Sequence, residues 1–311
     1  MTDVSIRPAA ADDIQACAEI WRESINDYTG RLNQHPIPDD LGRIIRLHKH
    51  LFSTDPGLFV VAERDGRVIA FAAAVRRDRL WFLSMCFVRP KEQARGIGRQ
   101  LLAAILPPAG ADAVLATAID SAQPISNGLY SRFGIVPRMP LMSMSGYVTN
   151  PAVLPDLPPG TVAVPFETIA SGPPGGPGHT ELTSAVNALD RELLGVEHPQ
   201  DHRFLRTEGR HGYLYRDVIG ATVGYGYTWE TGRVGPLAVR DEALVAPALG
   251  HLLRAVPSRG AQAVWVPGAA GSAVQLLLSA GLRFEDFPIL LSWSRPFADF
   301  ERYLPISPGL L

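Results

Sequence analysis

The sequence predicts a mixed α/β protein made of two similar halves, each with a central mixed β-sheet flanked by helices. Three observations predict this fold class. The chain has 311 residues, which is too long for most single hydrophobic cores and suits two domains of ordinary size. Segments with strand character alternate with segments of helical periodicity. The same order of elements recurs on both sides of a proline-rich segment near the middle of the chain.

The first half begins with a short strand at residues 4–6 and a helix over residues 12–21. In that helix Ile14, Ala18 and Trp21 recur at helical spacing. The further predicted elements are a helix near 39–51, strands at 58–62 and 68–75 joined by a turn at Asp65-Gly66, a strand at 80–88, a helix at 98–106, a strand at 113–119, a helix at 125–133 and a strand at 139–147. This order, βααβββαβαβ, predicts one mixed sheet.

The second half repeats this order. Its predicted strands are at residues 162–164, 213–215, 218–229, 232–239, 263–266 and 287–292, and its predicted helices are at 181–194, 202–208, 243–256 and 272–280. Residues 149–160 are rich in proline and are predicted to form a stiff linker between the halves. Residues 171–178 are rich in proline and glycine, so we expect a mobile loop that is neither helix nor central strand.

The bulk composition excludes several classes of function. A net charge of −2 lacks the basic footprint of a nucleic-acid-binding protein, so we expect a small-molecule or peptide ligand. The two cysteines, Cys17 and Cys86, are too few for a disulfide framework and are expected to be small buried hydrophobes. The longest apolar stretch, residues 68–75, is too short to span a bilayer, and the N-terminus lacks a signal-peptide pattern. We therefore expect a soluble, cytoplasmic protein with no membrane partner.

The segment with the clearest chemical meaning follows the predicted strand 80–88. That strand ends at Val88, a polar turn follows, Gly96 and Gly98 stand two residues apart, and a helix begins. Glycines allow a tight turn and close approach of a ligand to the backbone. The N–H groups at the start of the helix, together with the helix dipole, form an anion site suited to a pyrophosphate. Arg95 and Arg99 would add positive charge beside it.

Two segments resemble the acyl-CoA-binding motifs of the GNAT superfamily of N-acyltransferases. The first is Gln93-x-x-Gly96-x-Gly98. The second, residues 123–135, is similar to the GNAT segment in which an Asn-led helix carries Leu-Tyr and ends at Gly-Phe; here Gln123 replaces the Asn and Ile135 replaces the Phe. A Rossmann turn or a P-loop would need an extra glycine or a Gly-Lys-Ser/Thr, which the segment lacks. An ordinary glycine-containing turn between a strand and a helix is the alternative.

The resemblance implies acetyl-CoA, or another acyl-CoA, as co-substrate. The residues that it implies for binding are Phe87, Val88, Gln93, Ala94, Arg95, Gly96, Ile97, Gly98, Arg99, Gln123 and Asn127. It also implies that Tyr130 is catalytic, because the departing thioester sulfur needs a proton and a nearby phenol can act as general acid. The alternative is a core tyrosine whose hydroxyl is satisfied at the end of its helix.

The general base is not visible in the sequence. GNAT enzymes often carry a Glu on the strand before the glycine loop, but residues 80–88 contain no carboxylate. Ser84 and Cys86 of that strand could face an acceptor or pack in the core. The carboxylates that remain as candidates are Glu23, Asp27, Glu63 and Asp120. An amine that arrives partly deprotonated would need little help, and positioning would then supply most of the rate.

The second half resembles the GNAT order of elements but lacks its motifs. Residues 240–249 contain no glycine pair, and Asp241 and Glu242 would repel a phosphate. Leu277 stands at the position that corresponds to Tyr130. We therefore expect two tandem GNAT-like domains: an active acyltransferase domain at residues 1–148, the linker at 149–160, and a degenerate copy with a structural role at 161–311.

The histidines do not predict a metal site. His48 and His50 are two residues apart on a helix, so they point to different faces. His198 and His202 could share a face, but no third ligand stands near them at a metal-binding spacing. Both are expected at the surface, and we expect no metal.

Taken together, the residues and the resemblance predict transfer of an acetyl or other short acyl group from coenzyme A to a primary amine of a small molecule, by direct attack on the thioester. Two alternatives remain. One is an acyl-CoA-binding or regulatory module without catalysis, favoured by the absence of a visible base. The other is transfer of the acyl group from the pantetheine of an acyl carrier protein. This alternative follows from the resemblance to tandem GNAT proteins of natural-product pathways.

Overall fold

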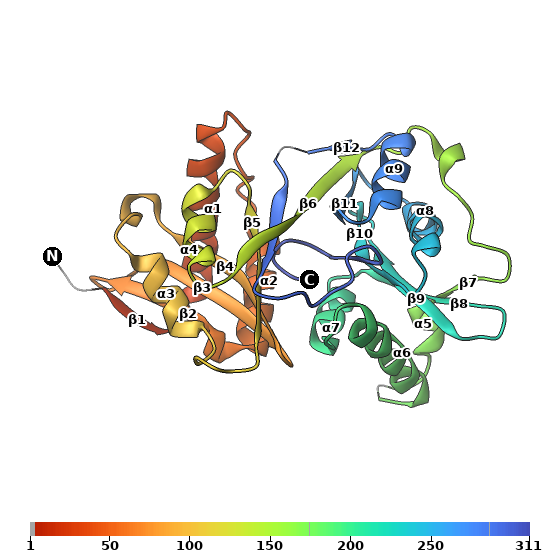
Figure 1. The fold of residues 1–311 in the computed structure, drawn as a ribbon, viewed down its shortest axis with the longest axis horizontal. Coiled ribbons are helices and arrows are strands. Elements are labelled where there is room, and N and C mark those ends of the chain that lie inside the picture. The colour runs from red at the N-terminus through yellow and green to blue at the C-terminus, as the bar shows by residue number, and fades with distance from the viewer. Residues whose placement is uncertain (1–3, 174, 286) are drawn as a thin grey trace. The chain divides into compact units, whose positions relative to one another are not determined.

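The structure is a computed structural model that describes residues 4–173, 175–285 and 287–311. The chain divides into two compact units, Met1–Thr117 and Ala118–Leu311, and each unit is a mixed α/β structure with a sheet and flanking helices (Figure 1). The predicted fold class is therefore confirmed. Among the described residues, no helix combines the length and the apolar character needed to cross a membrane; the cytoplasmic location stays a prediction.

The first unit has a sheet of five consecutive strands with the order β1-β2-β3-β4-β5. The strands are β1 (Ser5–Pro8), β2 (Phe59–Arg64), β3 (Arg67–Arg77), β4 (Leu80–Val88) and β5 (Val114–Asp120), whose last residues belong to the second unit. The helices are α1 (Asp13–Arg31), α2 (Gly42–Thr54) and α3 (Ile97–Ile105), with short 3-10 turns η1 (Pro56–Leu58) and η2 (Pro90–Glu92). Neighbouring strands are antiparallel up to β4, and β4 pairs with β5 in parallel.

Most elements of the first unit lie where the sequence predicts them. β4 has the predicted bounds, and the turn between β2 and β3 places both Asp65 and Gly66 in the left-handed region, as a two-residue hairpin requires. Helix α1 differs, because it continues to Arg31, ten residues beyond the predicted end. Those last residues are mostly polar and partly exposed, so they carry no apolar periodicity that would reveal a helix.

The core of the first unit lies on both faces of β3. Residues 69–75 are buried without alternation, which means that both faces of this strand are covered. On one face His48 of α2 packs against Phe71 and Met85. Trp81 donates a hydrogen bond from its indole nitrogen to the carbonyl of Ile105, the last residue of α3, at 3.0 Å. Cys17 is buried, as predicted, and Cys86 is half-buried; neither is in a disulfide.

The second unit has seven strands in the order β13-β6-β11-β10-β9-β8-β7, with β12 added to β6 and β14 added to β10. The strands are β6 (Val136–Gly146), β7 (Val162–Pro165), β8 (His211–Arg216), β9 (Thr222–Thr228), β10 (Arg233–Val239), β11 (Gln262–Pro267), β12 (Arg283–Phe284), β13 (Ile289–Trp293) and β14 (Tyr303–Leu304). The helices are α4 (Pro124–Ser131), α5 (Phe166–Ile169), α6 (Pro177–Leu193), α7 (Pro199–Thr207), α8 (Val245–Ala255) and α9 (Gly271–Ala280), with 3-10 turns η3 (Pro151–Val153) and η4 (Glu242–Leu244).

The boundary between the compact units does not coincide with the proline-rich segment. Strand β6 lies between β11 and β13 and is antiparallel to both, so residues 118–148 supply a central strand to the second unit. The predicted domains, residues 1–148 and 161–311, are defined by a repeated order of elements rather than by compactness, and they stay a prediction.

The proline-rich segment is fixed to the second unit rather than loose. Leu154 is buried, and Arg254 of α8 donates hydrogen bonds to the carbonyl oxygens of Leu154 and Pro155 at 2.8 and 3.0 Å. A Cβ at Gly250 of α8 would lie 2.9 Å from the carbonyl oxygen of Pro155, so this glycine allows the close approach of the segment to the helix.

One predicted loop is partly helical. The segment at residues 171–178 was expected to contain no helix, but α6 begins at Pro177. A proline is tolerated at the first position of a helix because its missing N–H has no intrahelical partner there. Pro174, in the same segment, lies outside the described residues.

Candidate acyl-CoA site

The predicted anion loop connects β4 to α3. Ala94 and Gly96 both have positive φ, 62° and 77°, so the chain makes two left-handed turns immediately before the helix. A Cβ at Gly96 would meet no protein atom within 4 Å. Glycine therefore suits this position because it adopts positive φ without strain, and the space beside it is open to a ligand. Residues 93–96 are exposed, whereas Ile97 is buried and anchors the start of the helix.

The start of α3 has the properties of an anion site. Its first turn contains no acidic residue, and no side chain caps its N–H groups. The first N–H groups of a helix have no intrahelical partner, and the helix dipole places partial positive charge there. The buried face of α3, with Leu101, Leu102 and Ile105, holds this end of the helix against the sheet. A phosphate could therefore accept hydrogen bonds from the backbone at this point.

The side chains around the loop are organised by ion pairs and by one shared carbonyl. The carbonyl oxygen of Val88 accepts hydrogen bonds from the Gln93 amide and from the Ser24 hydroxyl, both at 3.1 Å. Glu92 pairs with Arg64 and, at 2.9 Å, with Arg95, so Arg95 is partly neutralised and adds less charge than the sequence suggested. Arg99 is exposed on α3.

Strand β4 carries a β-bulge, which the sequence did not predict. Ala73 of β3 is opposite Met85, but Ala74 is opposite Leu83, so Ser84 is the extra residue. The parallel pairing with β5 covers Leu80–Leu83, and the hydroxyl of Thr117 donates a hydrogen bond to the carbonyl of Leu83 at 2.8 Å. Bulges re-aim side chains and are over-represented next to active sites. Phe87 lies beyond the bulge and stacks on Phe71, with ring centroids 5.8 Å apart.

The second predicted segment lies on α4, in the second unit. The Asn127 side-chain amide donates hydrogen bonds to the carbonyl oxygens of Asp120 and Gln123, at 3.0 and 2.8 Å. Its Oδ1 is buried and has no hydrogen-bond partner among the described residues. Gln123 precedes the first residue of α4 and is partly exposed. The Asn127 side chain therefore fixes the start of α4 with its nitrogen, while its oxygen is one of the buried polar atoms that the protein itself leaves unsatisfied among the described residues.

Tyr130 is in the last turn of α4 and is 6% exposed. Its carbonyl oxygen accepts hydrogen bonds from the N–H groups of Phe133 and Ile135, at 2.9 and 3.2 Å, which close the helix end. Ile135, one of the two departures from the family pattern, is fully buried. The segment therefore has a fixed backbone at the residue proposed for general-acid catalysis.

The geometry singles out none of the four carboxylates considered as general base. Glu23 pairs with Arg89, Asp27 pairs with Arg31 at 2.6 Å, and Glu63 pairs with Arg7 at 2.9 Å. Asp120 accepts a hydrogen bond from the N–H of Ala122 at 3.0 Å.

The corresponding turn of the second half, between β10 and α8, is built differently. The Asp241 carboxylate accepts a hydrogen bond from the N–H of Ala243 at 2.9 Å, at the start of the 3-10 turn η4 that precedes α8. The carboxylate of this turn therefore accepts from the backbone of its own turn, whereas Glu92, in the turn before α3, pairs with Arg64 and Arg95. Leu277, at the position that corresponds to Tyr130, is fully buried in α9.

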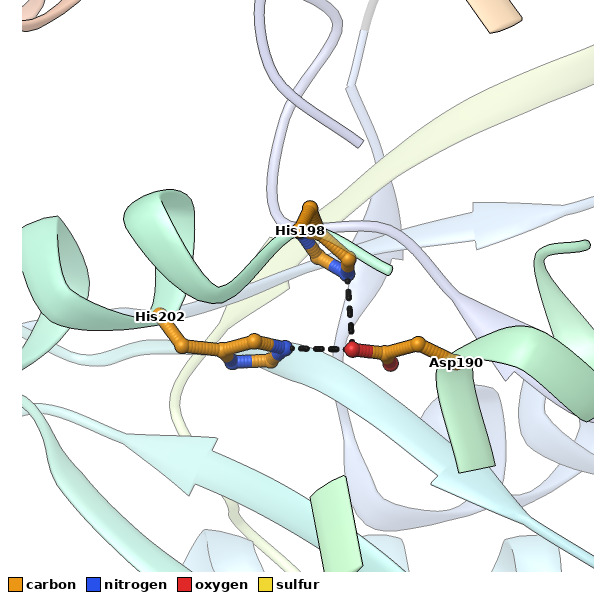
Figure 2. Close-up of side chains that lie close together, drawn as sticks. All are labelled: Asp190, His198 and His202. Carbon is orange, nitrogen blue, oxygen red and sulfur yellow. Dashed lines mark hydrogen bonds and ion pairs between the residues drawn. The ribbon is translucent and has the colours of Figure 1, made fainter. Parts of the chain in front are cut away.

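The expectation that His198 and His202 lie at the surface is wrong. They are 2% and 5% exposed, and both face the fully buried Asp190 (Figure 2). Asp190 comes from α6, His198 immediately precedes α7, and His202 lies on α7. Sequence spacing does not reveal this cluster, because its third residue, Asp190, lies on the preceding helix. Burial lowers the pKa of His198, but the Asp190 and Asp201 carboxylates raise it further, to about 10.

Comparison with protein families decides the assignment of the first half. A sequence profile of the acetyltransferase (GNAT) family matches residues 18–135, which include both predicted motifs up to Ile135. The chain carries a GNAT acetyltransferase domain. The match thus identifies residues 18–135 as a domain of an N-acetyltransferase family. A comparison with curated proteins finds no match.

Three solved structures have the same fold as this protein over almost the whole chain. A putative acetyltransferase from Pyrococcus horikoshii has a TM-score of 0.70 and 15% identity, covering 99% of this chain and 96% of its own. A GCN5-related N-acetyltransferase from Sphaerobacter thermophilus has a TM-score of 0.59 and 20% identity, with 96% and 98% coverage. A tandem GNAT protein from the clavulanic acid biosynthesis pathway has a TM-score of 0.53 and 17% identity, with 94% and 99% coverage. The fold is thus that of tandem GNAT proteins.

Proposed function

We propose that this GNAT protein transfers an acetyl or other short acyl group from coenzyme A to a primary amine of a small molecule. The observation that carries the proposal is the uncapped start of α3 after two left-handed residues, Ala94 and Gly96. This geometry suits the pyrophosphate of coenzyme A. The near-neutral net charge argues against a polyanionic acceptor.

The proposed reaction is a direct displacement. The acceptor nitrogen attacks the thioester carbonyl carbon, the C–N bond forms, the C–S bond breaks, and the nitrogen loses a proton. Tyr130 would give a proton to the departing sulfur as general acid. Asn127 would accept a hydrogen bond from an amide N–H of the pantetheine through its unpartnered Oδ1. Phe87, Val88, Gln93, Arg95, Ile97, Gly98, Arg99 and Gln123 complete the proposed binding set.

The second half would then be a structural copy without a coenzyme A site. Its turn after β10 is capped by Asp241, and a phosphate there would meet a carboxylate instead of open N–H groups. Leu277 would offer no proton donor.

One observation favours a second candidate, a GNAT-like protein that binds acyl-CoA without catalysis. Strand β4 has no carboxylate, and Glu23, Asp27 and Glu63 are each engaged in an ion pair. An assay of free thiol separates the two. The protein is incubated with acetyl-CoA and a panel of small primary amines, and thiol is counted with and without each amine. Amine-dependent release of thiol supports catalysis. Binding of coenzyme A without release with any amine supports the non-catalytic candidate.

The acyl donor is tested in the same way. An acyl carrier protein loaded with an acetyl-pantetheine is compared with acetyl-CoA at equal thioester concentration. Faster turnover with the loaded carrier protein would indicate that the carrier protein, and not coenzyme A, is the acyl donor. Turnover with acetyl-CoA alone would remove the carrier protein from the proposal.

A further inference from the structure

A buried polar cluster lies in the second half and takes no part in the proposed acyl transfer. It consists of Asp190, His198 and His202, whose side chains converge on one point (Figure 2). His202 Nε2 is 2.8 Å from Asp190 Oδ2, and His198 Nε2 is 3.3 Å from the same oxygen. One ligand atom from each of the three residues lies within 4.8 Å of the others. We propose that these three residues bind a divalent transition-metal ion of the zinc class.

The distances fit such an ion. Zinc bonds of about 2.0–2.2 Å to nitrogen and oxygen place neighbouring ligand atoms of a tetrahedral site roughly 3.3–3.5 Å apart. The 3.3 Å separation of His198 Nε2 from Asp190 Oδ2 already has this value. The 2.8 Å separation at His202 is a direct hydrogen bond, and it would open by a few tenths of an ångström when the ion replaces the proton. Three protein ligands leave a fourth position for water.

His198 supplies the observation that points to an ion rather than to a closed hydrogen-bond network. Its Nε2 is buried, and although it lies near Asp190 it has no hydrogen-bond partner of suitable direction among the described residues. Its other nitrogen, Nδ1, is 3.5 Å from the Asp201 carboxylate. Nε2 of His198 faces Asp190 Oδ2 at 3.3 Å, so a proton or a cation between the two atoms holds them together. A divalent ion would displace that proton and bond to both atoms.

The ligand atoms that face away from the cluster on His202 and Asp190 have hydrogen-bond partners, as is usual for metal ligands. His202 Nδ1 is 2.9 Å from the Tyr227 hydroxyl, so His202 can donate from Nδ1 and keep Nε2 for the ion. The Tyr225 hydroxyl donates to Asp190 Oδ1 at 2.5 Å, which leaves Oδ2 for the ion. Such partners fix the tautomer and orientation of metal-ligating histidines and carboxylates. Helices α6 and α7 and the residue before α7 thus supply the ligands, and strand β9 supplies their hydrogen-bond partners.

The site is tested by metal binding alone, so its outcome is independent of acyl transfer. Untagged full-length protein is treated with a chelator, titrated with Zn²⁺ against a chromophoric competitor, and analysed for bound metal after gel filtration. We expect one zinc per chain and a higher midpoint of thermal unfolding with zinc than with chelator. Cobalt should give the visible absorption of a four-coordinate N/O site. Absence of stoichiometric zinc or cobalt uptake by the folded wild-type protein would overturn the proposal.

Variants place the ion at the cluster. Tyr227→Phe keeps the ring and removes the hydroxyl beside His202, so zinc affinity should fall by about 10–100-fold while the fold persists. Asp190→Asn and His202→Gln should abolish stoichiometric binding. The matched control is His251→Ala, because His251 lies on α8 of the same unit and contacts Tyr213 and Tyr215 outside the cluster. Zinc affinity that is unchanged in Tyr227→Phe and in folded Asp190→Asn, or lost in His251→Ala, would contradict the assignment.

Discussion

His48 is an ionisable side chain fully buried in the core of the first unit. Its ring packs edge-on against Phe59 and Phe71, with centroids 5.9 and 5.1 Å away, and its Nε2 is 3.3 Å from the sulfur of Met85. Its Nδ1 has no hydrogen-bond partner within the described segments. Burial lowers the pKa of His48 from 6.5 to about 4, because the surroundings cannot solvate an imidazolium.

This shift predicts a dependence of stability on pH. Between pH 6.5 and about 4 the unfolded chain binds a proton at His48 that the folded chain refuses, so stability falls as the pH falls through that window. A shift of this size corresponds to roughly 3 kcal/mol at pH 4. The His48→Leu variant has no proton to bind there, so its free energy of unfolding should fall less between pH 6.5 and 4.5. Urea titrations at several pH values measure the difference; parallel curves for both proteins would contradict it.

Tyr130 is the residue on which the proposed chemistry depends. Tyr130→Phe keeps the ring in its buried position at the end of α4 and removes the proton donor. We expect kcat to fall by about 10²–10⁴-fold with the KM for the acyl donor nearly unchanged, because the lost interaction forms only in the transition state. Steady-state kinetics measure both constants, and calorimetry checks that coenzyme A still binds. Turnover at the parent rate would make Tyr130 a core tyrosine, and loss of folding would give its hydroxyl a structural role.

At the scale of elements, the turn between β4 and α3 and the turn between β10 and α8 differ in their electrostatics. The turn before α3 has no acidic residue in the first helical turn and no side-chain cap, whereas Asp241 caps η4 before α8. Both turns follow the central antiparallel strands of their sheets, β4 and β10. The difference lies in a few side chains, and it decides which turn can accept a phosphate.

The loop before α3 is tested through Gly96, whose φ of 77° a valine adopts only with strain. In Gly96→Val the strain, on the order of 1–3 kcal/mol, would move the loop, and the added side chain would occupy the open space. Coenzyme A affinity measured by calorimetry should therefore fall by about tenfold or more. Gly110→Val is the matched control, because Gly110 also has positive φ and open space but lies outside the motif. Equal affinity in Gly96→Val and wild type would remove the loop from the site.

At the scale of the whole chain, the element order is repeated but the compact units do not follow the repeat. Strand β6 precedes the proline-rich segment in sequence, yet it pairs with β11 and β13, which follow that segment. The proline-rich segment is held by Arg254 and by burial of Leu154. The second half of the sequence therefore does not complete its sheet alone, since that sheet includes β6 from before the segment.

The asymmetry of the halves predicts the stoichiometry of coenzyme A. We expect one bound molecule per chain, because Asp241 caps the turn after β10, whereas the corresponding start of α3 has no capping carboxylate. Native mass spectrometry with an excess of coenzyme A counts the bound molecules. At the same coenzyme A concentration, Gly96→Val should lower the fraction of chains that carry a bound molecule. A second bound molecule that disappears on substitutions around Ala246 would show that the second half also has a site.

Local patterns in the sequence determined most elements and the anion loop. The alternation of strand and helix patterns, the Asp65-Gly66 turn, and the glycines at 96 and 98 each act over a few residues, and the structure keeps them in place. The absence of a glycine pair after Val239 is likewise a local feature that can be seen in the sequence. Such features depend on backbone conformation and short-range periodicity, which a single sequence displays directly.

The tertiary structure alone decided the features that depend on partners far apart in sequence. The bulge at Ser84 arises from pairing with β3, and the placement of β6 arises from its two neighbouring strands. The cluster forms because Asp190 of α6 meets His198, which precedes α7, and His202 of α7. His198 and His202 were expected at the surface because no third ligand stands near them in the sequence at a metal-binding spacing. A buried carboxylate from another helix reverses that expectation, since a charge removed from water must find partners wherever the fold brings them.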